Sequence, residues 1–183
     1  MAELSMSELS GRPAEIAAVQ RLLEAAPEYH YRVYGRPADP EAAARLFAWL
    51  PAGRSCADRY VWGLRVDGEL IGVIALVRGH PYPDTALIDR FLLAEPWQHR
   101  GWGTRAVDLL LKRVQGWPEL RVLRIELPVT NQRVGKFLTR VGFHPTGERV
   151  PVPFSDQRLA SEVWVRPLAP LAGDLSPTQA GPF

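Results

Sequence analysis

Cysteine is nearly absent from this chain of 183 residues, which has a single one at Cys56. One thiol can form neither an internal disulfide nor a cysteine-based zinc site, so we expect neither to stabilise the fold. The four histidines are scattered along the sequence rather than clustered. We therefore expect no metal site.

An excess of charge of one sign is also missing. The chain has 22 Lys and Arg against 20 Asp and Glu, which gives a formal net charge of +2 at pH 7. Nucleic-acid-binding proteins usually concentrate basic side chains to neutralise phosphates, and this sequence has no run of Lys and Arg. A polynucleotide partner is therefore disfavoured.

Long hydrophobic runs are missing as well. The longest central apolar stretch, at residues 70–77, is interrupted by Gly72 and is far shorter than the roughly 20 residues that cross a bilayer. Residues 1–12 lack the basic start and apolar core of a signal peptide. We therefore expect a cytoplasmic protein with no membrane partner.

The composition is that of one globular domain. Hydrophobic residues make up 46% of the chain and charged residues 23%, a balance typical of folded rather than disordered proteins. Residues 169–183 are rich in Pro, Gly and Ala without an apolar period, which predicts a flexible tail. The domain is then expected at residues 13–168, after an N-terminal segment at 1–12.

Apolar periodicity predicts the order of helices and strands. Two helices are expected first, at residues 13–26 and 39–50, joined by an aromatic-rich connection at 28–37. Period-two runs, turn signals and caps then predict strands at 60–66, 70–77 and 86–93, a helix at 102–115, a strand at 120–127, a short helix at 131–140 and strands at 143–150 and 159–165. This order is typical of an α/β (or α+β) fold with a mixed, mainly antiparallel sheet of about six to seven strands flanked by helices.

Residues 98–104 contain a phosphate-binding pattern, because they follow a predicted strand and open a predicted helix. The first N–H groups of a helix lack intrahelical partners, and the helix dipole puts partial positive charge there. Gly101 and Gly103 remove side chains where the backbone would approach a diphosphate. His99 and Arg100 add positive charge beside them.

The two glycines also fit the start of a dinucleotide-binding fingerprint, with Glu126 ending the next strand as an NAD-binding acid would. A Rossmann unit, however, needs a repeated βαβ array with a parallel sheet. Here Asp67-Gly68 predicts a hairpin before the loop, and no second nucleotide-binding half follows. An NAD(P)-binding oxidoreductase is the weaker alternative.

The chain resembles the GNAT superfamily of N-acetyltransferases. The family's acetyl-CoA motif, Gln/Arg-x-x-Gly-x-Gly/Ala, is matched by Gln98, Gly101 and Gly103, and a second block by Asn131 followed by a short helix and Gly-Phe at 142–143. The resemblance implies acetyl-CoA as cosubstrate, a splayed central strand pair and transfer to an amine. It also implies cofactor contacts at Phe91, Leu92, Leu93, Gln98, His99, Arg100, Gly101, Trp102, Gly103, Thr104, Asn131 and Phe137.

Asp89 is the candidate general base. An alkylammonium acceptor must lose a proton before it attacks, since its pKa is roughly 10, and a carboxylate within reach can take that proton. Asp89 interrupts an apolar strand, and alternation predicts that it shares a face with Phe91. The Ile-Asp-x-Phe pattern is similar to a strand of aminoglycoside 6′-N-acetyltransferases whose Asp is assigned to acceptor chemistry. An ion pair is the alternative role, and Glu95 and Asp84 are further candidates.

Two departures from the family concern the acid and the acceptor. Many GNAT enzymes have a Tyr seven residues after the Asn, where this chain has Leu138. Another group or a water must then protonate the thiolate, or the chain is a catalytically silent acyl-CoA-binding module. Leu127-Pro128 lacks the acidic residue that the aminoglycoside subgroup has before this Pro, which argues against aminoglycosides.

Residues 27–51 are expected to select the acceptor, because the resemblance assigns that role to the early helices. Tyr29, Tyr31, Tyr34 and Trp49 either line a pocket or cover the sheet. The acceptor is an amine of a small molecule or of a protein, and the sequence does not choose between them. Homodimers are common in the family, so the oligomeric state also stays open.

Overall fold

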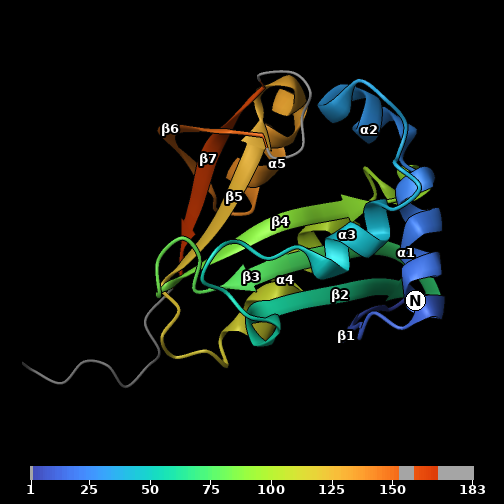
Figure 1. Cartoon of the computed structure of the whole chain (residues 1–183), viewed down its shortest axis with the longest axis horizontal. Helices are drawn as coiled ribbons and strands as arrows, with labels where there is room; N and C mark the ends of the chain where they lie inside the picture. Colours follow the sequence, from blue (N-terminus) through green and yellow to red (C-terminus); the bar gives the residue numbers. More distant parts are fainter. Residues whose placement is uncertain (1, 153–158, 169–183) are drawn as a thin grey trace, which may run out of the picture.

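A computed structural model describes residues 2–152 and 159–168, and the predicted tail at 169–183 lies outside them. One sheet with helices on both faces accounts for the described residues (Figure 1). The elements are β1 (Leu4–Glu8), α1 (Pro13–Glu24), α2 (Pro27–Tyr34), α3 (Ala42–Ala48), the 3-10 turn η1 (Cys56–Asp58), β2 (Arg59–Val66), β3 (Glu69–Arg78), β4 (Thr85–Leu93), η2 (Glu95–Trp97), α4 (Trp102–Val114), β5 (Val122–Pro128), η3 (Val129–Val134), α5 (Gly135–Arg140), β6 (His144–Pro151) and β7 (Ala160–Pro167).

The sheet has seven strands in the order β1-β2-β3-β4-β5-β7-β6. Neighbouring strands are antiparallel except β4 and β5, which are parallel and are joined by a crossover through α4. The predicted mixed, mainly antiparallel sheet flanked by helices is therefore confirmed. The antiparallel β2–β3–β4 meander also contradicts the parallel array that a Rossmann unit requires.

Strand β1 was not predicted from the sequence. It pairs antiparallel with β2, from Leu4 opposite Val66 to Glu8 opposite Trp62. Its five residues offer only Leu4 and Met6 as an apolar face, which is too short a pattern to stand out. The segment at 1–12, expected to precede the domain, thus contributes an edge strand to the sheet.

Helix α2 replaces the connection expected at residues 28–37, so that prediction was wrong. Pro27 occupies its first turn, and Gly35, with a φ of 68°, closes it in the left-handed conformation. His30 and Val33 are buried three residues apart on one side. Aromatic side chains have a weak helix propensity, and this helix depends on burying that side.

Alternation along the central strands divides the apolar side chains between two cores. Trp62 and Ile74 face α4 and pack with residues such as Leu110. Val61 and Val73 face the opposite side and pack under α1 and α3. Figure 1 shows α1 and α3 on the near side of the sheet, with α4 behind it.

The two parallel strands separate part-way along their length. Their pairing runs from Thr85 opposite Val122 to Ile88 opposite Ile125 and then stops. At the same point the β3–β4 register shifts, so that Asp89 is an extra residue in β4. In Figure 1, β5 and β7 turn away from the end of β4. The splayed central pair implied by the resemblance is confirmed.

Candidate active site

The end of β4 presents an unpaired backbone edge. Residues 90–93 pair with β3 on one side, while the pairing of β4 with β5 ends at Ile88. Backbone N–H and C=O groups on the open side are therefore available to an extended ligand. The Gln98 side chain approaches this edge and donates its Nε2 hydrogen to the Leu93 carbonyl at 2.8 Å. Gln98, predicted as a cofactor contact, thus also fixes the loop to the strand.

The loop before α4 has an unusual backbone. His99 and Gly101 have φ values of 59° and 82°, both in the left-handed region, and α4 starts directly afterwards. Among the described residues no side chain caps the helix, which leaves the N–H groups of Trp102, Gly103 and Thr104 without that partner. A Cβ built at Gly101 would meet no atom within 4 Å. The space beside Gly101, at the start of α4, is therefore open, as an anion site requires.

The open edge of β4 at residues 91–93 and the start of α4 at residues 101–104 together form a notch. Phe137 of α5 closes one side of it. Its ring lies 5.9 Å from the Phe91 ring, and a Cβ on Gly103 would come within 3.2 Å of it. Gly103 is thus required by close packing between α4 and α5, in addition to any approach to a ligand. The fold thus brings Phe91, Gly103 and Phe137 together from three separate segments of the chain.

Asn131 and Leu138 occupy different surroundings. Asn131 is buried, and its Oδ1 accepts a hydrogen bond from Arg32 Nη1 at 3.0 Å, which joins η3 to α2. Leu138 is 1% exposed in the core beneath α4. A side chain at position 138 therefore points into the core here, which explains why an apolar residue is accommodated there.

Asp89 is paired with Arg59. The distances are 2.5 Å from Arg59 Nη1 to Asp89 Oδ1 and 3.0 Å from Nη2 to Oδ2. Arg59 is 5% exposed and also donates to the Leu46 carbonyl. The bulge corrects one expectation: Asp89 lines a pocket on the α3 side with Leu87, whereas Phe91 packs in the opposite core. Alternation alone had placed Asp89 and Phe91 on one face.

A pocket of about 320 Å³ lies between α2, α3 and the diverging ends of β4 and β5. Its lining includes Tyr29, Tyr34, Trp49, Asp89, Arg90 and Glu126. Tyr31, in contrast, is 56% exposed and does not belong to it. The early helices thus form a pocket beside the notch. Arg90 of β4, which sequence reasoning had not singled out, also lines the pocket and reaches the Tyr29 and Tyr34 hydroxyls of α2. A charged residue in an apolar strand was the available signal.

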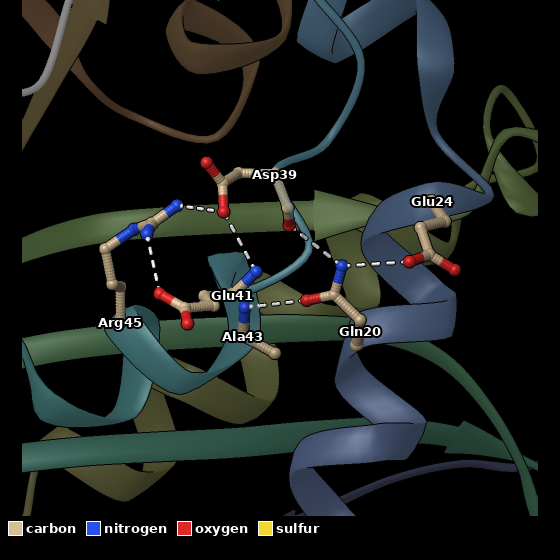
Figure 2. Close-up of polar contacts among 6 residues, drawn as sticks. All are labelled: Gln20, Glu24, Asp39, Glu41, Ala43 and Arg45. Atoms are coloured by element: carbon tan, nitrogen blue, oxygen red, sulfur yellow. Dashed lines mark hydrogen bonds and ion pairs between the residues drawn. The ribbon is translucent and has the colours of Figure 1, made fainter.

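Two lining residues of this pocket, Asp39 and Arg45, belong to a polar network drawn in Figure 2. Gln20 of α1 donates to the Asp39 carbonyl at 2.9 Å and accepts from the Ala43 backbone N–H at 3.0 Å. Asp39 in turn accepts from the Glu41 N–H and forms an ion pair with Arg45 at 2.6 Å. Asp39 was expected as the cap of a helix starting there, but α3 begins at Ala42. The network instead ties the loop to α1.

Burial shifts the pKa values of three aromatic side chains that line the pocket, Tyr29, His30 and His80. Burial, and then the charge of Arg90, lowers the pKa of His30 to about 4, so its imidazole is neutral at pH 7. Burial also raises the pKa of Tyr29, which keeps the phenol protonated. Burial, followed by Arg124 and Arg54, lowers the pKa of His80. The two histidines therefore add no positive charge to the pocket at neutral pH.

Comparison with known proteins gives one decisive finding. Residues 18–143 match the model of the acetyltransferase (GNAT) family. The chain belongs to this family. A search among curated proteins finds no match.

Solved structures of the family share the fold at low sequence identity. An acetyltransferase from Thermus thermophilus has a TM-score of 0.70 and 21% identity, covering 92% of this chain and 100% of its own. The aminoglycoside acetyltransferase AAC(6′)-Ib in complex with coenzyme A has a TM-score of 0.68 and 17% identity, over 90% and 95%. Spermidine N-acetyltransferase from Vibrio cholerae, in complex with CoA and spermine, has a TM-score of 0.68 and 12% identity. The match covers 90% of this chain and 95% of that one.

Two kinds of feature are absent from the part of the chain that the structure describes. No helix there is long and apolar enough to cross a membrane. Within residues 2–152 and 159–168, no group of three or more His, Cys, Asp or Glu side chains is arranged to hold a metal ion.

Proposed function

We propose that this GNAT protein moves an acetyl group from acetyl-CoA directly to a primary amine of a small molecule or a protein. The observation that carries the proposal is the uncapped start of α4 beside the unpaired edge of β4. Helix N–H groups suit a diphosphate, and a free strand edge suits the amides of a pantetheine arm. Two similar proteins are named for amine acceptors, an aminoglycoside and spermidine, which supports an amine here.

The residues proposed to hold acetyl-CoA divide by the part of the molecule they would bind. The N–H groups of Trp102, Gly103 and Thr104 would face the diphosphate, with the exposed side chains of His99 and Arg100 adding charge. The backbone of residues 91–93 would pair with the pantetheine arm, and Phe137 would pack beside it. Gln98 and Asn131 complete the proposed set.

The transfer removes two protons from the acceptor nitrogen, one before attack and one after the nitrogen has bonded to the thioester carbon, and it returns one proton to the leaving thiolate. The amine nitrogen bonds to the thioester carbon, the carbon–sulfur bond breaks, and the sulfur leaves as thiolate. Asp89 is proposed to take the ammonium proton, because its carboxylate lines the pocket beside the notch. Leu138 cannot protonate the thiolate, so another group or a water does so. A cytoplasmic setting, expected from the sequence, belongs to the same proposal.

Thermal unfolding tests the cofactor loop. Acetyl-CoA should raise the melting temperature of the protein, and Gly101→Glu should abolish that rise by adding bulk and negative charge at the first turn of α4. Gly53→Glu is the matched control, because Gly53 also has a left-handed φ (78°) and open space around it. A rise retained in Gly101→Glu would contradict the loop assignment.

Thiol release separates the enzyme from a silent acyl-CoA-binding module. The wild type should release coenzyme A from acetyl-CoA with at least one member of a panel of polyamines, aminoglycosides, amino acids and peptides. A raised melting temperature with no release across the panel would favour the silent module instead. That outcome would leave the loop assignment intact and remove the transfer step.

A further inference from the structure

Arg90 occupies the pocket without an acidic partner. Its guanidinium contacts two phenol oxygens of α2: Nη1 donates to Tyr29 and Nη2 to Tyr34, the latter at 3.4 Å. The Arg90 group also lies over the Tyr29 ring, 5.2 Å from its centroid. Among the described residues no carboxylate forms an ion pair with it. Its side-chain hydrogen bonds therefore go to neutral phenols, while the neighbouring Asp89 carboxylate acts on it through space without an ion pair.

The carboxylates that line the pocket are all engaged elsewhere. Asp39 pairs with Arg45, Asp89 with Arg59, and Glu126 with Arg124. Each of these pairs is at 3.1 Å or less. Arg90, flanked by a neutral His30, therefore makes its part of the pocket electropositive. A polycationic acceptor would be repelled there.

Hydrogen-bond capacity is also left over around Arg90. Its Nε and the Nε2 atom of His30 are buried and have no hydrogen-bond partner among the described residues. His30 is 3% exposed and lines the same pocket. A buried polar group without a partner is costly, so a ligand oxygen that accepts from Arg90 would bind favourably. The neutral His30 ring is hydrogen-bonded to the Leu23 backbone and offers Nε2 as an acceptor, which suits an N–H group of the same ligand.

We propose, building on the transferase function above, that the acceptor is a small amine that also carries a carboxylate, and that Arg90 binds this carboxylate. A guanidinium presents its N–H groups as a planar fork that matches a carboxylate, and the Tyr29 and Tyr34 hydroxyls keep O–H hydrogens to donate. At about 320 Å³ the pocket is at the small end of ligand sites. This size fits a compound of amino-acid dimensions.

The position of Arg90 in β4 explains how this contact orients the amine. Arg90 follows the bulged Asp89 and precedes Phe91, where the proposed pantetheine edge begins. A carboxylate held at Arg90 leaves the amine of the same small molecule near Asp89 and the mouth of the notch. Recognition and proton removal would then use adjacent residues of one strand.

The test compares acceptors that differ only in charge. Thiol release is measured for α- and ω-amino acids, each paired with its own carboxamide, using wild type, Arg90→Met and Arg90→Lys. We expect the wild type to prefer the acid over the carboxamide by tenfold or more in kcat/KM. Arg90→Met should lower kcat/KM for the acid by about ten- to a hundredfold and lower that for the carboxamide much less. Arg90→Lys should be intermediate, because it keeps the charge but loses the fork.

Two controls keep a negative result interpretable. Arg65→Met removes the same charge from β2, where Arg65 donates to the Gly68 carbonyl. It should change kcat/KM for neither the acid nor the carboxamide. An unaltered rise in melting temperature with acetyl-CoA shows that Arg90→Met is folded. Equal wild-type rates for acid and carboxamide, or an equal loss for both in Arg90→Met, would overturn the proposal.

Calorimetry distinguishes failure of this proposal from failure of the transferase function. If no amine is acetylated, binding of the same acids and carboxamides to the coenzyme A-saturated protein is measured. Binding of the acid that is lost in Arg90→Met would support the carboxylate site although transfer is absent. Binding that does not distinguish acid from carboxamide, or no binding of either, would reject the site.

Discussion

Asp89 is a charged residue with two competing roles. As a base it must accept a proton, whereas its bidentate pairing with Arg59 already engages both carboxylate oxygens and fixes their orientation. Arg59 is nearly buried, so removal of either partner leaves the other poorly solvated. A loss of activity in an Asp89 variant alone would therefore not identify the base.

Paired substitutions resolve this ambiguity. Asp89→Asn and Arg59→Gln both break the ion pair and should each destabilise the protein, by about 3 kcal/mol in urea unfolding. If Asp89 is the base, only Asp89→Asn should lower kcat by about a hundredfold or more, at saturating acetyl-CoA and below the unfolding transition. The same fall in kcat for both variants would assign Asp89 a structural role.

His30 should make stability depend on pH. Its pKa is lowered from 6.5 to about 4 by burial and by Arg90, so between these values the unfolded chain binds a proton that the folded protein does not. Stability should therefore be highest above pH 6.5 and fall as the pH drops toward 4, by on the order of 3 kcal/mol from this group. Urea midpoints across this range should fall less in His30→Gln, with a residual slope from His80. An unchanged slope would contradict this assignment.

Helix α2 is the element that makes the pocket, and it is held at both ends by distant segments. At its start the Glu28 N–H donates to Glu95 Oε1 at 2.9 Å, and near its end Arg32 binds Asn131. A carboxylate at a helix N-terminus satisfies a free N–H and interacts favourably with the dipole. Glu95, a secondary candidate for the base, thus acts as a cap supplied from another part of the chain.

Removal of this cap should loosen α2. Glu95→Ala is expected to reduce the free energy of unfolding by about 1 kcal/mol and to raise the acceptor KM, while the shift caused by acetyl-CoA persists. Glu69→Ala, at an exposed end of β3, is the control for the loss of one acid. No difference between the two variants in urea unfolding and KM would show that the contact does not hold α2.

At the scale of the whole molecule, β1 decides where the domain begins. The strand covers the edge of β2, and Leu4 and Met6 pack against the core under α4. Deletion of residues 2–8 should therefore lower the free energy of unfolding by on the order of 2 kcal/mol, from two partly buried apolar side chains. Unchanged urea unfolding would support the domain start at residue 13 that the sequence predicted.

Local patterns determined most of the elements of this protein. The Asp67-Gly68 turn, the period-two runs and the glycines before Trp102 define the meander and the loop before α4, because their conformations depend on adjacent residues. Helix α2 could not be predicted from local patterns, because its aromatic side chains favour a helix only once they are buried. The motif residues of the loop could likewise be named from the sequence, because the motif is contiguous.

Only the tertiary structure decided which side chains meet. The bulge at Asp89 reverses the facing of the residues after it, and no local signal in β4 marks that extra residue. The pairing of Asp89 with Arg59 joins positions 30 residues apart, and the contact of Arg90 with Tyr29 joins positions 61 apart. Charge balance in a pocket is a property of such distant neighbours. The sequence therefore determined the family and the loop before α4, while the fold determined which charges line the pocket.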